Sequence, residues 1–398
     1  MLAEALPVAF RSLFRRCSTH QKSTYSGIHP ECNPAGGRLR RRGPSASGSC
    51  DTRVFAQPMS HIRIAAEEAF APSELLDRYR QLLEGATGLD PGFVSLWGHY
   101  AGKSSQATQL VARIQDLGEG RLRDMDDSGI AKQILSLSAP GVQIFDAATA
   151  TGLAVSCNDQ LAEAIRRHPG RFAGLAAIAP QDPASAAKEL ERGVGRLGLK
   201  GAIINSHTSG EYLDDPKFWD IFEAADALGV PIYLHPTTPP PAMIAPFAES
   251  GLAGAIYGFA VETGLHMLRL ITSGVFDRFP RLRMVAGHLG EALPYWMFRV
   301  DFMHHAMVAS GRHPRVGRLE RKPSDYLREN FYVTTSGMAW QPVILFVQSV
   351  LGADHVLYAQ DYPYQYVPEE VKVTDNLPIS DSDKHKLYQE NAEKLFGL

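Results

Sequence analysis

The stretch HVLYAQDYPY, residues 355–364, indicates both the fold of this 398-residue chain and the place of its chemistry. It opens with a short apolar run typical of a buried strand and then delivers one carboxylate, Asp361, into a turn that contains Pro363. In a parallel barrel, the first polar residue past the carboxyl end of a strand stands on the rim that carries the active site. A lone Asp there is more often a turn or helix-capping residue, so its role depends on what the other strands supply.

Seven further runs rich in strand-forming residues precede this one. The eight expected strands are residues 62–66, 132–137, 172–178, 199–205, 230–234, 282–286, 331–335 and 356–359. Amphipathic segments of helical period lie between them, for example at 159–167, 184–197, 216–228, 265–277 and 340–351. Strands that alternate with helices predict a parallel sheet, and eight such units predict a (β/α)8 TIM barrel. The alternative, a doubly wound open sheet, normally has a glycine-rich phosphate loop after its first strand, and EEAFAPS at 67–73 is not one.

The composition, with 44% hydrophobic and 9% aromatic residues, is that of a folded globular protein. Residues 1–58 contain nine Lys or Arg and three Asp or Glu, so this segment is basic. Because the whole chain has a net charge of -3, residues 59–398 must be acidic, and they give no reason to expect nucleic-acid binding. No run of about 18 apolar residues is present, so a membrane span is not expected. Only Cys157 lies outside residues 1–58, which predicts no disulfide framework and a reduced, cytoplasmic protein.

Residues 1–58 are expected to form a disordered extension. They are rich in Arg, Ser and Gly and have too little apolar periodicity to build a core. Two interpretations stay open: a mitochondrial-type transit peptide, or an extension upstream of a start at Met59. Residues 59–398 are expected to form one catalytic barrel domain.

Polar residues at the ends of different strands are expected to converge on one rim of the barrel. Glu67 follows the first strand, His235 the fifth, His288 the sixth and Asp361 the eighth. Glu67, His235 and Asp361 form a mixed oxygen and nitrogen set suited to one divalent ion such as Zn²⁺ or Mn²⁺. Each residue alone has a structural explanation, but four strand ends with ligand-type groups favour a site.

The motif GHLGEALPYWMFR, residues 287–299, adds candidate substrate-binding residues. His288 and Glu291 lie three residues apart, in a turn expected to open a helix, where Glu291 can orient the imidazole for binding or proton transfer. Arg299 is a candidate clamp for a substrate carboxylate. Its alternative is a surface charge pattern with Asp301, because periodicity does not fix the helix face on which Arg299 lies.

The order of EEAFA, YLHP, GHLGEALPYW, TTSG and DYPY over residues 60–398 resembles the metal-dependent aromatic acid decarboxylases of the amidohydrolase superfamily. The details SLWGHYA, GAIYGFAVETG and YAQDYPYQY look most like the 5-carboxyvanillate decarboxylases, and the chain is also similar to 2,3-dihydroxybenzoate and gamma-resorcylate decarboxylases. The resemblance implies that Glu67, His235 and Asp361 bind the metal, and that His288, Glu291 and Arg299 hold substrate or assist proton transfer. It also implies a homo-oligomer, either a dimer or a tetramer.

This resemblance implies non-oxidative loss of CO₂ from an ortho-hydroxy aromatic acid, with Asp361 as the group that protonates the ring carbon. Hydrolases of the superfamily typically begin with His-x-His on the first strand, and Glu67-Glu68-Ala69 stands there instead. Some decarboxylases keep a histidine two residues after the glutamate, so Ala69 implies one fewer ligand. A metal-dependent hydrolase, a decarboxylase of an acyclic semialdehyde acid and an inactive barrel remain the alternatives.

Overall fold

The computed structural model describes residues 61–102 and 104–398, so the expectations for residues 1–58 lie outside the described part of the chain. The strands of this part are β1 (Ile64–Phe70), β2 (Lys132–Leu137), β3 (Phe172–Gly174), β4 (Ala176–Ala177), β5 (Ala202–Asn205), β6 (Ile232–His235), β7 (Met284–Ala286), β8 (Phe331–Thr334) and β9 (Val356–Leu357). Its helices are α1 (Ser73–Gly85), α2 (Pro91–Tyr100), α3 (Ser105–Gln115), α4 (Glu119–Asp127), α5 (Ala147–Arg167), α6 (Pro183–Gly195), α7 (Trp219–Leu228), α8 (Ala245–Glu249), α9 (Gly258–Thr272), α10 (Val275–Arg278), α11 (His288–Glu291), α12 (Leu293–Ser310), α13 (Pro323–Asn330), α14 (Gln341–Leu351), α15 (Val371–Asp375), α16 (Asp381–His385) and α17 (Asn391–Phe396).

The strands form a closed parallel barrel. They pair in chain order, β1 to β3 in one sheet and β4 to β9 in the other. The Lys200 N–H donates to the Gly174 carbonyl at 2.8 Å and joins the two sheets, while the Ala66 N–H donates to the Tyr358 carbonyl at 2.9 Å and closes the ring. The expected (β/α)8 barrel is therefore confirmed, and the carboxyl ends of its strands meet at one rim.

Each expected strand is present, although several limits were wrong. The third expected strand is interrupted at Leu175 and gives β3 and β4. The first runs on to Phe70, so Glu67 and Glu68 lie within β1 and not after it, and the pairing of β1 with β2 shifts register between Ala65 and Glu68. Two consecutive acidic residues usually indicate the end of a strand. Here both carboxylates are buried and have hydrogen-bond partners, which allows the strand to continue.

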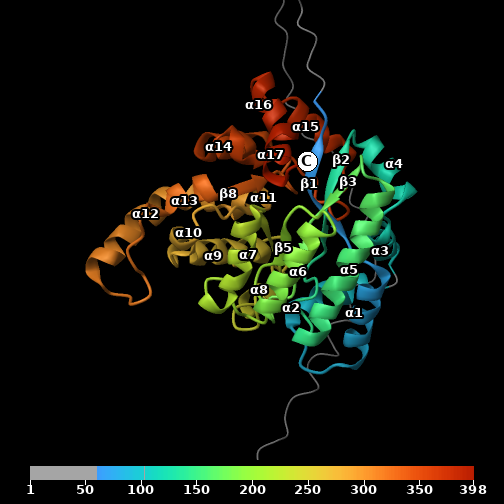
Figure 1. The fold of residues 1–398 in the computed structure, drawn as a ribbon, viewed down its shortest axis with the longest axis horizontal. Coiled ribbons are helices and arrows are strands. Elements are labelled where there is room, and N and C mark those ends of the chain that lie inside the picture. Colours follow the sequence, from blue (N-terminus) through green and yellow to red (C-terminus); the bar gives the residue numbers. More distant parts are fainter. Residues whose placement is uncertain (1–60, 103) are drawn as a thin grey trace, which may run out of the picture. The chain divides into compact units, whose positions relative to one another are not determined.

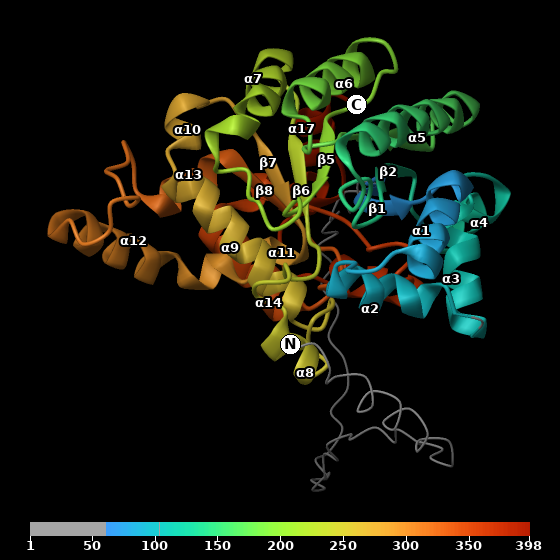
Figure 2. The same cartoon turned by 90° about the horizontal axis from the view of Figure 1, so that it is seen from below.

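Helices surround the barrel and bury its outer face. Figure 2 shows β5 to β8 in the middle of the molecule, with α6, α7, α10 and α13 around them. The core consists of strand residues packed against helix residues such as Leu161 of α5, Phe222 of α7 and Met267 of α9. Helix α12 projects from the body of the barrel in both views (Figures 1 and 2), and only Leu293, Pro294 and Met297 of its residues are buried. No helix in the described part of the chain is long and apolar enough to cross a membrane.

Candidate active site

A cavity of about 230 Å³ opens at the carboxyl ends of the barrel strands. Four of the predicted site residues line it: Glu67, His235, His288 and Asp361. Its remaining lining residues are Ala69, Leu96, Tyr100, Ser136, Leu137, Ser138, Ala139, Ala255, Phe259, Tyr364 and Gln365. A larger surface cavity of about 690 Å³ lies near α1 and α5, but it contains no histidine and none of the predicted residues. The small cavity is therefore the candidate active site.

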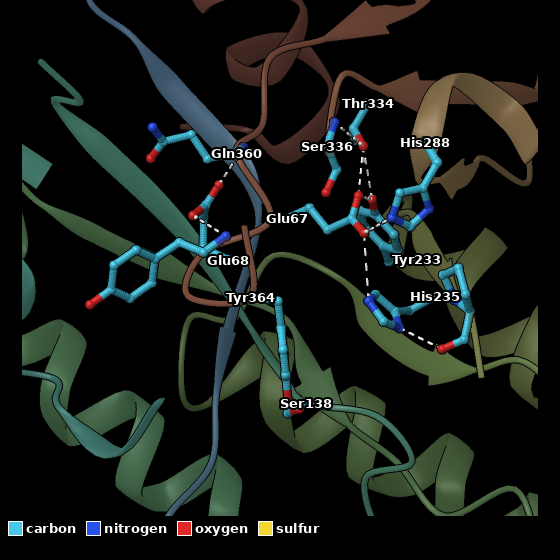
Figure 3. Close-up of polar contacts among 12 residues, drawn as sticks. Glu67, Glu68, Ser138, Tyr233, His235, His288, Thr334, Ser336, Gln360 and Tyr364 are labelled. Atoms are coloured by element: carbon cyan, nitrogen blue, oxygen red, sulfur yellow. Dashed lines mark hydrogen bonds and ion pairs between the residues drawn. The ribbon is translucent and has the colours of Figure 1, made fainter. Parts of the chain in front are cut away.

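Glu67 lines this cavity and has its two carboxylate oxygens in different surroundings (Figure 3). Its Oε2 accepts hydrogen bonds from the Tyr233 hydroxyl and from Thr334 Oγ1, the latter at 2.6 Å. Its Oε1 is buried and has no hydrogen-bond partner among the described residues. That oxygen instead faces two imidazole nitrogens, His235 Nε2 at 3.5 Å and His288 Nε2 at 3.8 Å. A buried anionic oxygen without a donor is costly unless a cation or a ligand meets it.

The two imidazoles are held in place through their other ring nitrogens. His235 Nδ1 lies 2.8 Å from the carbonyl oxygen of Pro236 and must donate its proton there. Burial lowers the pKa of His235, so the ring is neutral at pH 7 and its Nε2 presents a lone pair toward Glu67. A neutral imidazole whose Nδ1–H is bound to a carbonyl is the usual form of a metal-ligating histidine.

His288 has the opposite electrostatic character. Its Nδ1 lies 2.7 Å from Glu291 Oε1. Burial by itself would lower the pKa of His288, but the charges of Glu291 and Glu67 outweigh it and raise the pKa to about 10. Without a bound cation, the ring is therefore protonated, stabilised by Glu291, and suited to an anionic substrate group. The predicted orientation of His288 by Glu291 is present in the structure.

The turn that carries this pair is left-handed, which the sequence did not predict. Residues 288–292 all have positive φ, at 50°, 56°, 82°, 52° and 61°, and α12 begins only after them. Each left-handed residue other than glycine costs roughly 1–2 kcal/mol, and such strain persists where surrounding contacts fix it, often at functional sites. Gly287, just before the turn, has no room for a side chain, because a Cβ there would lie 2.8 Å from Glu67 Oε1 and 2.9 Å from Oε2.

Asp361 lies four residues beyond the end of β9 and has a positive φ of 71°. Its carboxylate and the His288 ring flank the same space beside Gly337, since a Cβ built there would lie 3.7 Å from Asp361 Oδ2 and 3.4 Å from His288 Cδ2. Burial raises the pKa of Asp361 to about 8, while the positive charge of His288 opposes the shift. Without a bound cation, Asp361 is thus able to hold a proton near pH 7.

The side chains fit a divalent ion in part. No group of three or more His, Cys, Asp or Glu in the described residues is assembled closely enough to hold an ion as it stands. Two ligand atoms that share one ion are roughly 3 to 3.5 Å apart, and the 3.5 Å between Glu67 Oε1 and His235 Nε2 matches that spacing. Two members of the predicted ligand set are therefore arranged for an ion, and the third, Asp361, lines the same cavity. Ala69 also lines it and offers no further ligand.

Arg299 does not lie in this cavity. It is an exposed residue of α12 and lines a separate apolar surface cavity with Trp296 and Met303. Arg299 is thus not brought together with the four predicted residues that line the candidate active site. Its role as a clamp for a substrate carboxylate stays a prediction. Glu291 contributes to the lining of this second cavity too.

The sequence reasoning missed several residues of the site. Tyr233 lies two residues before His235 on β6, so both side chains are on the same face of the strand, and this period-two relation was an available signal. Thr334, the first residue of the quoted TTSG motif, ends β8 and was not assigned to the site. Tyr364, whose hydroxyl lies 2.5 Å from Ser138 Oγ, belongs to the quoted DYPY motif but was not assigned.

A second polar cluster lies close by but is sealed from the cavity. The Leu213 N–H donates to His266 Nε2 at 3.0 Å, so Nδ1 carries the ring proton and donates to Ser206 Oγ at 3.0 Å. Ser206 in turn donates to Glu262 Oε1 at 2.9 Å. Burial lowers the pKa of His266 to about 3 and raises that of Glu262 to about 8, so both are neutral at pH 7. We interpret this Ser–His–Glu set as structural, because all three side chains are fully buried.

The barrel and the carboxylate–imidazole site on its rim define the class, and the chain belongs to the amidohydrolase family, whose model matches residues 94–398. Among curated relatives, the gamma-resorcylate decarboxylase of Polaromonas sp. is 37% identical over 344 residues, which are 84% of this chain and 98% of that protein.

Two solved structures are also similar to this chain. The 5-carboxyvanillate decarboxylase of Novosphingobium aromaticivorans, complexed with manganese and 4-hydroxy-3-methoxy-5-nitrobenzoic acid, superposes with a TM-score of 0.83 at 51% identity and covers 85% of this chain and 96% of its own. The 2,6-dihydroxybenzoate decarboxylase of Rhizobium, complexed with 2,6-dihydroxybenzoate, has a TM-score of 0.74 at 34% identity and covers 85% of this chain and all of its own.

Proposed function

We propose that the chain is a carboxy-lyase that decarboxylates an ortho-hydroxy aromatic acid, such as 5-carboxyvanillate or a dihydroxybenzoate, without oxidation and with one bound Mn²⁺ or Zn²⁺. The observation that carries this proposal is the unpartnered Glu67 Oε1 between one neutral and one positively charged imidazole. The neutral His235 suits a metal, and the charged His288 suits the substrate anion. The names of the relatives at 34–51% identity support the reaction class.

The size and walls of the cavity support a single substituted ring as substrate. At about 230 Å³, the cavity is smaller than the roughly 300–1,000 Å³ of sites for drug-sized ligands. Phe259 and Leu96 supply apolar surface on which a ring can pack, and Tyr364 and Ser138 supply hydroxyl groups for ring substituents. These features favour an aromatic acid over an extended acyclic semialdehyde acid.

The mechanism follows from the need to avoid an aryl carbanion. Glu67, His235 and Asp361 would hold the ion, which acts as a Lewis acid that favours the ionised form of an ortho hydroxyl group. His288 binds the anionic carboxylate, with Glu291 fixing its ring. Asp361 takes up the proton that the ortho hydroxyl group releases and donates it to the carboxyl-bearing ring carbon, and the carbon–carbon bond breaks to release CO₂ as the electron pair returns to the ring. The hydroxyl group of the next substrate supplies the proton for the next turnover.

The test is a substrate panel with purified full-length protein. Ortho-hydroxybenzoates, including 5-carboxyvanillate and 2,6-dihydroxybenzoate, are incubated with the manganese-loaded protein, and CO₂ release and loss of the ring carboxylate are followed. Asp361→Asn should abolish turnover while substrate still binds. Full turnover by Asp361→Asn with metal bound would refute the proton-donor role. Hydrolysis of an ester or lactone in the absence of decarboxylation would favour the hydrolase alternative.

We also propose that the chain works as a homo-oligomer, a dimer or a tetramer, and that helix α12 forms part of the contact between copies. Phe298 is 87% exposed and Tyr295 71% exposed, and Phe302 and Trp296 add further apolar surface on the same helix. Clusters of this kind on a protein surface mark interaction sites. Light scattering after size exclusion should give a mass above one chain, and Phe298→Glu should reduce it; a monomeric wild-type protein would refute the proposal.

A further inference from the structure

Glu68 lies next to the cavity carboxylate Glu67, but its side chain does not line the cavity and has no role in the chemistry described above. It is fully buried within β1. Its Oε1 accepts the N–H of Gln360 at 3.0 Å (Figure 3). Its Oε2 accepts the N–H of Tyr362 at 3.3 Å. These two N–H groups belong to the residues on either side of Asp361. One buried carboxylate therefore holds the backbone of the proposed proton donor from both sides.

The conformation of Asp361 shows why such a contact matters. Strand β9 ends at Leu357, so Asp361 is outside the regular ladder, and its φ of 71° is unfavourable for a residue with a side chain. A left-handed residue turns the flanking N–H groups toward one side, where they form a concave anion-binding arrangement. The Glu68 carboxylate occupies that position. Its two hydrogen bonds stabilise the one backbone conformation in which the Asp361 side chain enters the cavity.

A second set of contacts fixes Glu68 itself. Gln133 of β2 donates from Nε2 to Glu68 Oε2 at 3.3 Å and accepts at Oε1 from the Arg121 guanidinium at 3.3 Å. Arg121 is fully buried on α4 and also donates to the Ala69 carbonyl at 2.7 Å. Its guanidinium lies over the ring of Tyr362, 4.5 Å from the centroid. Burial raises the pKa of Glu68 to about 8, and the Gln360 N–H and the charge of Arg121 oppose that shift. The guanidinium thus favours the acceptor form of the Glu68 carboxyl group and packs on the loop that this group holds.

We propose that Glu68 is a positioning residue that sets the place of the Asp361 carboxylate relative to Glu67 by holding the two backbone N–H groups that flank it. Two adjacent residues of β1, Glu67 and Glu68, then have different roles. Glu67 points into the cavity toward the ion, and Glu68 points away from it and holds the backbone of the opposite ligand. The expected effect of Glu68 on metal affinity rests on Glu67, His235 and Asp361 as the metal ligands. Only the expected effect on turnover rests on the proposed function.

The competing interpretation is that Glu68 only helps to close the barrel. The backbone hydrogen bonds from Ala66 to Tyr358 and from Ala69 to Tyr362 already join β1 to this segment. If closure were the whole role, loss of Glu68 would reduce stability and leave the affinity for Mn²⁺ unchanged. Metal affinity therefore separates the two interpretations.

The test is Glu68→Gln in the full chain. Glutamine keeps the size of the side chain but places an NH₂ group where one backbone N–H needs an acceptor. We expect Mn²⁺ to dissociate roughly 10- to 100-fold more readily, as for other residues that orient a ligand from behind. We also expect kcat to fall more than KM rises. Glu68→Asp, which keeps the carboxyl group but is too short to reach both N–H groups, should weaken Mn²⁺ binding in the same direction.

Two controls distinguish positioning from general damage. Glu189→Gln on α6 changes another buried carboxylate, bound to Arg192 at 2.8 Å and Asn158 at 2.6 Å; it should lower Tm without changing Mn²⁺ affinity. In an Asp361→Ala background, Glu68→Gln should have no further effect on Mn²⁺ affinity, because it acts through Asp361. Unchanged Mn²⁺ affinity in both Glu68 variants, or an equal loss in the Asp361→Ala background, would overturn the inference. Failure of the wild-type protein to decarboxylate any panel compound would instead refute the proposed function and leave these binding results valid.

Discussion

Replacing Tyr233 by Phe should weaken metal binding, although Tyr233 is not one of the proposed ligands. The Tyr233 hydroxyl is one of two donors to Glu67 Oε2, and the other is Thr334 Oγ1 at 2.6 Å. Burial, together with the charge of Glu67, raises the pKa of Tyr233 well above its usual value, so the phenol remains a donor throughout the working pH range. These bonds hold the carboxylate in the rotation that directs Oε1 toward His235 Nε2.

The size of the effect follows from the loss of one hydrogen bond to a charged group, worth about 1.5–3 kcal/mol. At about 1.4 kcal/mol per factor of ten, this corresponds to a roughly 10- to 100-fold weaker Kd for Mn²⁺. The assay is titration of the metal-free protein with Mn²⁺, with the free ion measured by electron paramagnetic resonance. Thr334→Val should cause a similar loss, and the double variant should lose less than the sum, since both donors serve one oxygen. An unchanged Kd in both single variants, with lowered Tm, would refute the orienting role.

Four other changes test separate parts of the structure. His235→Ala should reduce Mn²⁺ content and activity together, by at least about 100-fold in affinity, as measured by elemental analysis after dialysis; full metal content would contradict its role as ligand. His288→Asn should keep near-normal metal content but lose ~10²–10⁴-fold in kcat/KM, with a smaller loss in Glu291→Gln and a double variant less than additive; metal loss would make His288 a ligand. His266 has a folded pKa of about 3 against an ordinary 6.5, so the unfolded chain alone gains its proton as the pH falls from 6.5 toward about 3. Its burial therefore costs stability on acidification, and His266→Gln should reduce the slope of unfolding free energy against pH by up to about 1.4 kcal/mol per unit in urea titrations, whereas an unchanged slope would contradict this. A protein that begins at Met59 should retain activity, and an insoluble or inactive product would show that residues 1–58 belong to the fold.

The barrel could be predicted because buried parallel strands leave a plain signal, which is a short run of apolar residues between longer amphipathic segments. The same signal fails where a polar residue is buried and paired. Glu67 and Glu68 read as the end of a strand, yet β1 continues to Phe70 because both carboxylates have partners inside the protein. Residues that serve function are the ones that break the pattern of the element that carries them.

The candidate site was predictable as a set of strand ends, but its internal arrangement was not. The positive φ angles of His288 and Glu291 have no sequence signal beyond the neighbouring Gly290. Helical periodicity could not decide the face on which Arg299 lies, and it proved to be the outer one. The contact of Glu68 with the N–H of Gln360 joins a side chain to a backbone group 292 positions away, and any residue type at 360 except proline could supply that N–H.

Gly287 and Glu67 share one small space, although they are far apart in the sequence. Since a Cβ at position 287 would lie 2.8 Å from Glu67 Oε1, alanine there should push the carboxylate out of the place in which it faces the two imidazoles. The choice of residue at one position therefore limits the choice at the other, and positions 67 and 287 should vary together among descendants of this chain.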